Sequence, residues 1–272
     1  MNVFVKPLKR FGQNFLIDKN IIKKIIQATR LTLRDTVLEI GPGRGALTFE
    51  LARHVKRLVA VELDRGLCSQ LLKQTQNMNN LDVICCDILK FNLKSYGKKS
   101  KIKSFKVVAN VPYYITTPIL EFLFKNIGSI DDVFLTVQKE VAERMTAKPG
   151  TKVYGSLTCF VSYYCSPKVL FKIKRNSFWP VPKVDSCFIR LKPLKQNERK
   201  FGVKSQDLFF RTVRSAFGQR RKQLYASLSG ILRKNELRLL PAQDLLSQRP
   251  EQLSLADFIR LSNLIFDFLK KR

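Results

Sequence analysis

A short apolar segment followed by three closely spaced glycines constrains the fold of this chain more than any other feature. Residues 36–40 predict a buried strand, and Gly41, Gly43 and Gly45 follow it directly. A helix is expected next, over 47–54, and then a second strand. Glycine lets a backbone turn sharply and approach a ligand closely. The order of strand, glycine turn, helix and strand therefore predicts a βαβ unit in a parallel sheet.

The same alternation continues to about residue 192, so we expect an α/β fold of the Rossmann-like kind with helices on both faces of the sheet. Further strands are predicted over 58–63, 83–86, 105–110, 133–137, 168–173 and 184–191, and further helices over 20–29, 65–77, 118–124 and 139–146. Residues 90–106 carry seven lysines and no acid, and they predict an exposed loop.

The character of the chain changes around Lys192. Residues 195–235 hold eleven Lys or Arg against two acids. Helical periodicity predicts helices over 206–217, 219–229 and 254–270. The sequence thus predicts two domains. A catalytic domain spans 1–192, including the N-terminal segment 1–17, and a small, basic, all-helical domain spans 193–272.

The charge balance indicates a polyanionic partner. Lys and Arg number 50 against 21 Asp and Glu, a formal charge of +29, and clustered cations are favoured where they bind phosphates and release counterions. The chain has no run of 18 apolar residues and no N-terminal apolar signal region, so a cytoplasmic protein with no membrane contact is expected. Six cysteines without a C-x-x-C pair, and one histidine, predict no metal site and mostly small core cysteines in a reducing compartment.

The residues after the glycine turn predict a site for an adenosine-containing cofactor. Glu62 lies 21 residues after Gly41, at the end of the second strand, where a carboxylate accepts hydrogen bonds from ribose hydroxyls. Asp87 follows the third strand, where it could accept a hydrogen bond from an adenine amino group. Gly41, Gly43 and Ala46 also satisfy the dinucleotide fingerprint. A nicotinamide oxidoreductase is therefore an open alternative on this motif.

The segment Asn110-Val111-Pro112-Tyr113 ends the fourth strand and suits an amino group on a flat ring. The exocyclic amine of adenine is a poor nucleophile, because its lone pair is delocalised into the ring. Two acceptors around its N–H groups, the Asn110 side-chain oxygen and the Val111 carbonyl, would favour a pyramidal nitrogen. Pro112 fixes the backbone that presents the carbonyl, and Tyr113 can stack on the base.

A third segment, 178–186, reads Phe-Trp-Pro-Val-Pro-Lys-Val-Asp-Ser. Its prolines predict a stiff, extended loop. Phe178 could cover the opposite face of a base flipped out of its stack. An aromatic and proline-rich surface loop before a strand is the plainer interpretation.

Over essentially its whole length the chain resembles the rRNA adenine N6-dimethyltransferases of the KsgA type. The resemblance rests on the segments 11–16, 39–45, 110–113 and 178–186, together with Glu62 and Asp87. It implies a class I S-adenosylmethionine-dependent methyltransferase fold with a helical C-terminal domain. It also implies the substrate, two adjacent adenosines in a hairpin near the 3′ end of small-subunit rRNA, each receiving two methyl groups.

The resemblance also implies roles for particular residues. Six of them would contact the cofactor: Asn14, Leu16, Gly41, Glu62, Asp87 and Asn110. Four would surround the target base: Asn110, Pro112, Tyr113 and Phe178. Asn14 and Leu16 would close over the cofactor from the N-terminal segment, and Tyr113 and Phe178 would sandwich the base.

The expected partner is small-subunit rRNA within an immature small ribosomal subunit, bound by a monomer. The predicted anchor is a basic group in the C-terminal domain, Arg211, Arg214, Arg220, Arg221 and Lys222. Two alternatives with RNA partners stay open. One is a large-subunit (23S) rRNA adenine methyltransferase of the macrolide-resistance type, and the other is a non-catalytic assembly factor with the same fold.

Overall fold

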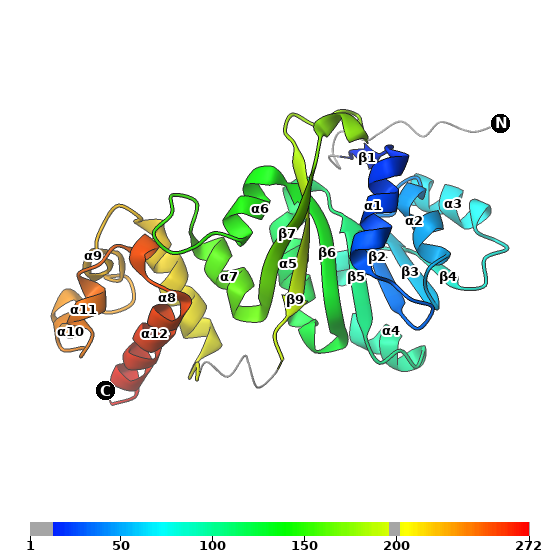
Figure 1. Cartoon of the computed structure of the whole chain (residues 1–272). Helices are drawn as coiled ribbons and strands as arrows, with labels where there is room; N and C mark the ends of the chain where they lie inside the picture. Colours follow the sequence, from blue (N-terminus) through cyan, green and yellow to red (C-terminus); the bar gives the residue numbers. More distant parts are fainter. Residues whose placement is uncertain (1–12, 196–201, 272) are drawn as a thin grey trace. The chain divides into compact units, whose positions relative to one another are not determined.

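The computed structural model describes residues 13–195 and 202–271 and divides the chain into two compact units (Figure 1). The first comprises residues up to Ala142 together with Lys168–Pro193, and the second comprises Glu143–Pro167 and the chain from Leu194 onward. The sequence had placed the whole of 143–167 in the first domain. These residues join the second unit because Tyr154 and Cys159 are buried in its apolar cluster.

The first unit contains a seven-stranded sheet in the order β4-β3-β2-β5-β6-β9-β7. The first five of these strands pair in parallel, and β9 pairs antiparallel with β6. The strands are β2 (Thr36–Ile40), β3 (Arg57–Glu62), β4 (Leu81–Cys85), β5 (Phe105–Asn110), β6 (Ile130–Gln138), β7 (Cys165–Ile173) and β9 (Ser186–Pro193). The predicted α/β class and its largely parallel sheet are confirmed.

Helices and a small ribbon complete this unit. The helices are α1 (Lys19–Thr29), α2 (Ala46–Ala52), α3 (Arg65–Gln74), α4 (Leu93–Lys99), α5 (Thr116–Lys125) and α6 (Lys139–Met145), whose residues from Glu143 onward belong to the second unit. Figure 1 shows α1 across one face of the sheet. There Ile25 of α1 and Leu51 of α2 pack with Val37, Val108 and Phe134 of the strands. The ribbon pairs β1 (Phe15–Leu16) with β8 (Phe178–Trp179).

The strand order places a binding edge between β2 and β5. From β2 the chain continues outward to β3 and β4, and then returns to β5 on the other side of β2. In open α/β sheets, ligands bind at the carboxyl ends of the strands where the order reverses in this way. Gly41, Glu62, Asp87 and Asn110 stand at the carboxyl ends of four neighbouring strands, so the topology brings the predicted site residues to one edge.

The expectation of a loop over 90–106 was wrong, because residues 93–99 form α4. The Asn92 side chain caps this helix by accepting a 2.9 Å hydrogen bond from the Ser95 N–H. Leu93 is fully buried, and the Tyr96 hydroxyl donates a 2.6 Å hydrogen bond to Asp82. The loop was predicted from the number of lysines alone, and the helix depends instead on the capping Asn92, the buried Leu93 and the hydrogen-bonded Tyr96.

The expectation of mostly small core cysteines holds for three of the six and did not foresee a disulfide. Cys159, Cys165 and Cys187 are buried thiols, as expected. Cys68 of α3 and Cys85 of β4, however, form a disulfide with their Cα atoms 5.8 Å apart. This bond ties α3 to the end of β4, directly before Cys86 and Asp87.

The second unit is helical around one apolar cluster, in which Phe209 and Phe258 are fully buried. Its helices are α7 (Ser156–Tyr164), α8 (Gln206–Gly218), α9 (Leu224–Ser227), α10 (Lys234–Arg238), α11 (Gln243–Leu246) and α12 (Leu255–Lys270). The sequence did not predict α7. Of the helix expected over 219–229 only α9 is present, because α8 ends at Gly218 and a turn follows.

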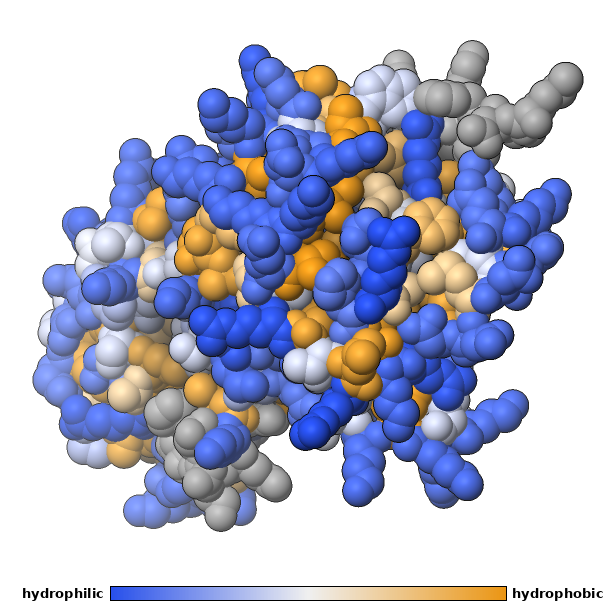
Figure 2. Space-filling model, turned by 45° about the vertical axis from the view of Figure 1, so that its right-hand side comes forward, coloured by the Kyte–Doolittle hydropathy of each residue, from blue (hydrophilic) through white to orange (hydrophobic). Residues whose placement is uncertain are grey.

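Hydrophilic side chains stand out over much of the face shown in Figure 2, as a chain with a formal charge of +29 requires. Within the described ranges, no helix is long and apolar enough to cross a membrane.

Candidate active site

A cavity at the carboxyl edge of the sheet is lined by residues of five segments of the first unit. These segments are 13–16, 39–47, 61–63, 86–88 and 110–115. Eight of the nine predicted site residues line it: Asn14, Leu16, Gly41, Glu62, Asp87, Asn110, Pro112 and Tyr113. Phe178 does not.

The glycine turn forms the floor of this cavity. Gly41 and Gly43 have φ values of +69° and +59°, a region that side chains rarely adopt. A Cβ at Gly43 would lie 2.9 Å from the Phe15 ring, whereas one at Gly41 would meet no atom within 4 Å. Packing against the N-terminal ribbon therefore requires glycine at position 43. At Gly41 the lack of a side chain leaves the backbone accessible from the cavity.

Glu62 holds the turn in place from the end of β3. One carboxylate oxygen accepts a 2.9 Å hydrogen bond from the Gly43 N–H, and the other accepts one of 2.8 Å from the Asp64 N–H. The side chain is 6% exposed, and burial raises its pKa despite these two hydrogen bonds. A carboxylate fixed in this way keeps acceptor capacity beside the glycine turn, where a ribose would lie.

Glu39 is a site residue to which the sequence had assigned no role. It is 2% exposed, and burial, reinforced by the nearby charge of Glu62, raises its pKa to about 8. Its Oε2 atom has no hydrogen-bond partner among the described residues. An unsatisfied polar atom in a cavity wall fits a site whose ligand brings a donor. The only earlier signal was its position two residues before the glycine turn.

Asp87 lies at the end of β4 and does two things. One of its oxygens accepts a 2.9 Å hydrogen bond from the Leu89 N–H and so caps a short helical turn. The residue also lines the cavity, with the second oxygen left for a ligand. The capping role and the predicted adenine contact are therefore compatible.

The N-terminal segment reaches this cavity through the β1–β8 ribbon. Phe15 pairs with Trp179 and Leu16 with Phe178. The Arg44 guanidinium lies 4.7 Å from the Phe15 ring centroid and 4.6 Å from that of Trp179, so a cation from the glycine turn contacts both rings. Residues 1–12 of the predicted closing segment lie outside the described residues.

Asn110 connects this strap to the end of β5. Its side-chain N–H donates a 2.9 Å hydrogen bond to the Asn14 carbonyl. This bond assigns the amide orientation, because the nitrogen must face the carbonyl, and the Oδ1 atom is then available in the cavity. Val111 and Pro112 follow in the cavity wall, with Pro112 at φ −58°. The Asn110 side chain can therefore offer one acceptor, and the expected pair of acceptors around an amino group stays a prediction.

Tyr113 is partly buried beside Asn110. Its hydroxyl and the Oγ atom of the fully buried Ser186 lie 2.7 Å apart and share a hydrogen bond. Burial raises the pKa of Tyr113, so the phenol stays neutral at ordinary pH. Ser186, the last residue of the 178–186 segment, therefore fixes the ring that is predicted to stack on a base.

Phe178, the predicted partner of Tyr113, occupies a different environment. It is 1% exposed and belongs to the apolar cluster under α1 and α2. Two other aromatic rings are more exposed. Trp179, the next residue in the sequence, is 38% exposed, and Tyr114, which lines the cavity, is 54% exposed. The stacking role of Phe178 stays a prediction, and the structure gives this side chain a core role as well.

The residues of the predicted rRNA anchor in the second unit differ in whether their charges are paired within the protein. The Arg220 guanidinium donates to Glu251 at 3.2 Å and to the Thr151 carbonyl at 3.1 Å, so it is bound within its own unit. Arg214, Arg221 and Lys222 are exposed and form no ion pair within the described part of the chain. The Arg211 guanidinium lies 4.0 Å from the Asp207 carboxylate, so among the five predicted anchor residues Arg214, Arg221 and Lys222 keep unpaired charges for a polyanion.

The fold and this cavity define a class I S-adenosylmethionine-dependent methyltransferase, with S-adenosylmethionine as its cofactor. No group of three or more His, Cys, Asp or Glu among residues 13–195 and 202–271 could hold a metal ion. Residues 6–267 match the family model described as Ribosomal RNA adenine dimethylase. The chain belongs to that family.

Individual relatives agree with this assignment. Ribosomal RNA small subunit methyltransferase A of Clostridioides difficile is 44% identical over 94% of this chain and 90% of its own. The protein of the same name from Anoxybacillus flavithermus is 40% identical over 95% and 90%. A crystal structure of a dimethyladenosine transferase from Plasmodium falciparum superposes with a TM-score of 0.79, at 29% identity over 94% and 98%. That of the 23S rRNA methyltransferase ErmE gives 0.69, at 25% identity over 93% and 100%.

Proposed function

We propose that this protein dimethylates the N6 atoms of two adjacent adenosines in the 3′-terminal hairpin of small-subunit rRNA. The observation that carries the proposal is Asn110, whose Nδ2 atom is bound to Asn14 and whose Oδ1 atom is thereby left to accept from an amino group. Relatives at 40–44% identity are named as small-subunit rRNA methyltransferases, and this favours the proposal over the 23S alternative, whose named structure is 25% identical.

Ten residues divide the work in this proposal. Asn14, Leu16, Gly41, Glu62 and Asp87 hold the cofactor, which supplies an electrophilic methyl group when bound. The Asn110 oxygen and the Val111 carbonyl accept the two N–H groups of the adenine amine and expose its lone pair. Pro112 fixes that carbonyl, and Tyr113 and Phe178 stack on the flipped base.

The reaction needs positioning more than acid–base chemistry. The amine attacks in line from a fixed pose, so most of the rate comes from orientation and from excluding water. Once alkylated, the nitrogen is acidic and releases its proton to solvent without a strong base. The monomethyl product keeps one N–H for Asn110 or Val111 and can react again.

We further propose a cytoplasmic monomer that acts on immature small subunits. In this proposal residues 1–192 carry the catalytic residues and 193–272 bind rRNA, with Arg214, Arg221 and Lys222 as phosphate contacts. Such contacts are insensitive to sequence but sensitive to salt.

The test is transfer of tritium from labelled S-adenosylmethionine to immature small subunits, with free large-subunit rRNA as the comparison. Dimethyladenosine at adjacent positions of the small-subunit hairpin is the expected product. Label in large-subunit RNA would keep the chemistry and reject the target. Cofactor binding without transfer to either RNA would favour a non-catalytic assembly role.

A further inference from the structure

A second hollow of ≈ 370 Å³ lies at the opposite edge of the sheet, where β2, β3, β5 and β6 begin. It is strongly basic: six of its lining residues are Lys or Arg and two are Asp. The cations are Arg34, Lys56, Arg57, Lys101, Lys103 and Lys106. The proposed catalytic chemistry uses none of them.

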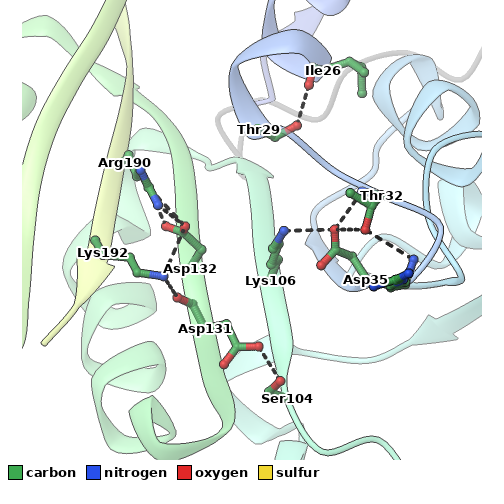
Figure 3. A network of polar contacts seen from close by, with 11 residues as sticks. Ile26, Thr29, Thr32, Asp35, Ser104, Lys106, Asp131, Asp132, Arg190 and Lys192 are labelled. Atoms are coloured by element: carbon green, nitrogen blue, oxygen red, sulfur yellow. Dashed lines mark hydrogen bonds and ion pairs between the residues drawn. The ribbon is translucent and has the colours of Figure 1, made fainter. Parts of the chain in front are cut away.

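The two acids that line the hollow, Asp35 and Asp131, both accept hydrogen bonds within the protein, and Asp35 is also ion-paired (Figure 3). The Lys106 ammonium lies 2.9 Å from the Asp35 carboxylate, which also accepts from Thr32 at 2.7 and 3.0 Å. Burial opposes ionisation of Asp35, but these donors outweigh it and lower its pKa. Asp131 accepts from the Ser104 hydroxyl. Lys106 therefore neutralises Asp35, whereas Asp131 keeps its negative charge, because a hydroxyl donor does not neutralise a carboxylate.

Arg57 is paired as well, through a 2.7 Å bond to Asp82, which leaves four cations unneutralised. Arg34, Lys56, Lys101 and Lys103 are exposed, and no ion pair of theirs occurs among the described residues. Four like charges around one hollow repel one another and favour a polyanion as the ligand. Among its described lining residues the hollow keeps a net positive charge, four unpaired cations against the one unpaired carboxylate of Asp131, and a surface serving solubility alone has no need to gather them at a concave site.

Local structure holds two of these lysines in place. Lys101 adopts a left-handed conformation at φ 56°, and the Ile102 N–H donates a 2.8 Å hydrogen bond back to the Gly97 carbonyl. A Cβ at Gly97 would lie 3.2 Å from the Ile102 oxygen and 3.4 Å from the buried Phe105 ring. The backbone of this turn therefore packs against the core. We call Lys101 and Lys103, which line the hollow beside the turn, its rim cations.

We propose that this hollow binds the phosphate backbone of a second rRNA segment, separate from the one that carries the target adenosine. The hollow has no aromatic side chain among its lining residues, so it offers phosphate contacts and no stacking surface for a base. The five residues of β2 separate it from the catalytic edge by about 17 Å. A nucleotide held there cannot be the one at Asn110. The inference rests on the proposed rRNA substrate and extends it to a second contact.

The test compares two doubly substituted proteins that lose the same charge. The variant Lys101→Gln/Lys103→Gln removes two rim cations, and the matched control Lys23→Gln/Lys73→Gln removes two exposed lysines that do not line the hollow. Binding to immature small subunits should weaken roughly tenfold in the rim variant and little in the control. The slope of log affinity against log salt should become shallower by about 1.4–1.8, the value for two lost phosphate contacts.

Two companion measurements make the result decisive. Cofactor affinity should be the same in all three proteins, and protein-free small-subunit rRNA should show the same loss as the subunit. Equal affinity and equal salt slope in rim variant and control would overturn the inference, and so would a loss confined to intact subunits, which would indicate a ribosomal protein as partner. If the proposed function itself is wrong, the unsubstituted protein will transfer no label to subunits. If only the inference about the hollow is wrong, that transfer remains, so the two failures are distinguishable.

Discussion

At the carboxyl ends of β2 and β3, Glu39 and Glu62 are buried, and burial raises the pKa of both. At the amino ends of the same strands, Asp35 is paired with Lys106, its pKa is lowered, and unpaired cations surround it. The carboxyl edge thus contains desolvated acids, and the amino edge contains an excess of positive charge. The difference teaches that the two edges of a single sheet can offer different environments, one of buried acids and one of unpaired cations.

The two kinds of edge should respond to different perturbations. Desolvated groups are sensitive to pH and to the loss of single atoms, while exposed cations are sensitive to ionic strength. Substitutions at the carboxyl edge should therefore change stability or turnover and leave the salt dependence of RNA binding intact. The reverse is expected at the amino edge.

The largest effect on stability is expected at Phe178. Replacement by Ala should cost about 3–5 kcal/mol of unfolding free energy, because the ring is 1% exposed in the apolar cluster. Urea denaturation measures this. Phe178→Leu keeps most of the volume and should fold, so its methyl transfer isolates any stacking role. Full activity in the Leu variant would assign Phe178 to the core alone.

The largest effect on turnover is expected at Asn110. Removing its oxygen in Asn110→Ala should lower kcat by about 10²–10³, as losing one positioned hydrogen-bonding group does in other enzymes. Cofactor binding, measured by calorimetry, should remain detectable. Asn79→Ala is the matched control, since Asn79 is exposed and outside the cavity. Near-normal turnover of Asn110→Ala would contradict the proposed mechanism.

Much of the catalytic edge could be predicted because its residues follow strands in a fixed order. The strands over 36–40 and 105–110 were predicted to the residue, and parallel ends must meet at one edge. The cavity accordingly contains Gly41, Glu62 and Asn110. Local patterns were enough for this part of the fold.

The rest depends on contacts between distant segments, which no local pattern encodes. The pairing of Phe178 with Leu16 decides that its ring is buried. The disulfide of Cys68 and Cys85 depends on how α3 packs beside β4. The amino-edge hollow was missed for the same reason, because Arg34 and Lys101 are 67 positions apart in the sequence and meet only in the folded sheet.

A smaller effect is expected at Tyr113, where two substitutions separate ring from hydroxyl. Tyr113→Ala should lose about 1–3 kcal/mol of transition-state or RNA binding free energy, the range for one stacked base. Tyr113→Phe keeps the ring and loses only the bond to Ser186, worth about 1 kcal/mol. Single-turnover rates and RNA affinity measure both. Equal rates in the unsubstituted and Ala proteins would argue against stacking.

The prediction that most sharpens the contrast between the edges concerns the pH dependence that Glu39 gives to stability. Its folded pKa of about 8 exceeds the unfolded value of about 4.5, so the neutral acid stabilises the fold at low pH. That stability falls as pH rises from the unfolded value through about 8, by at most about 1.4 kcal/mol per pH unit. Glu39→Gln cannot ionise, so its unfolding free energy should lose this fall and exceed that of the unsubstituted protein above pH 8. Parallel stability curves for the two proteins from pH 5 to 9 would show that Glu39 is not a desolvated acid.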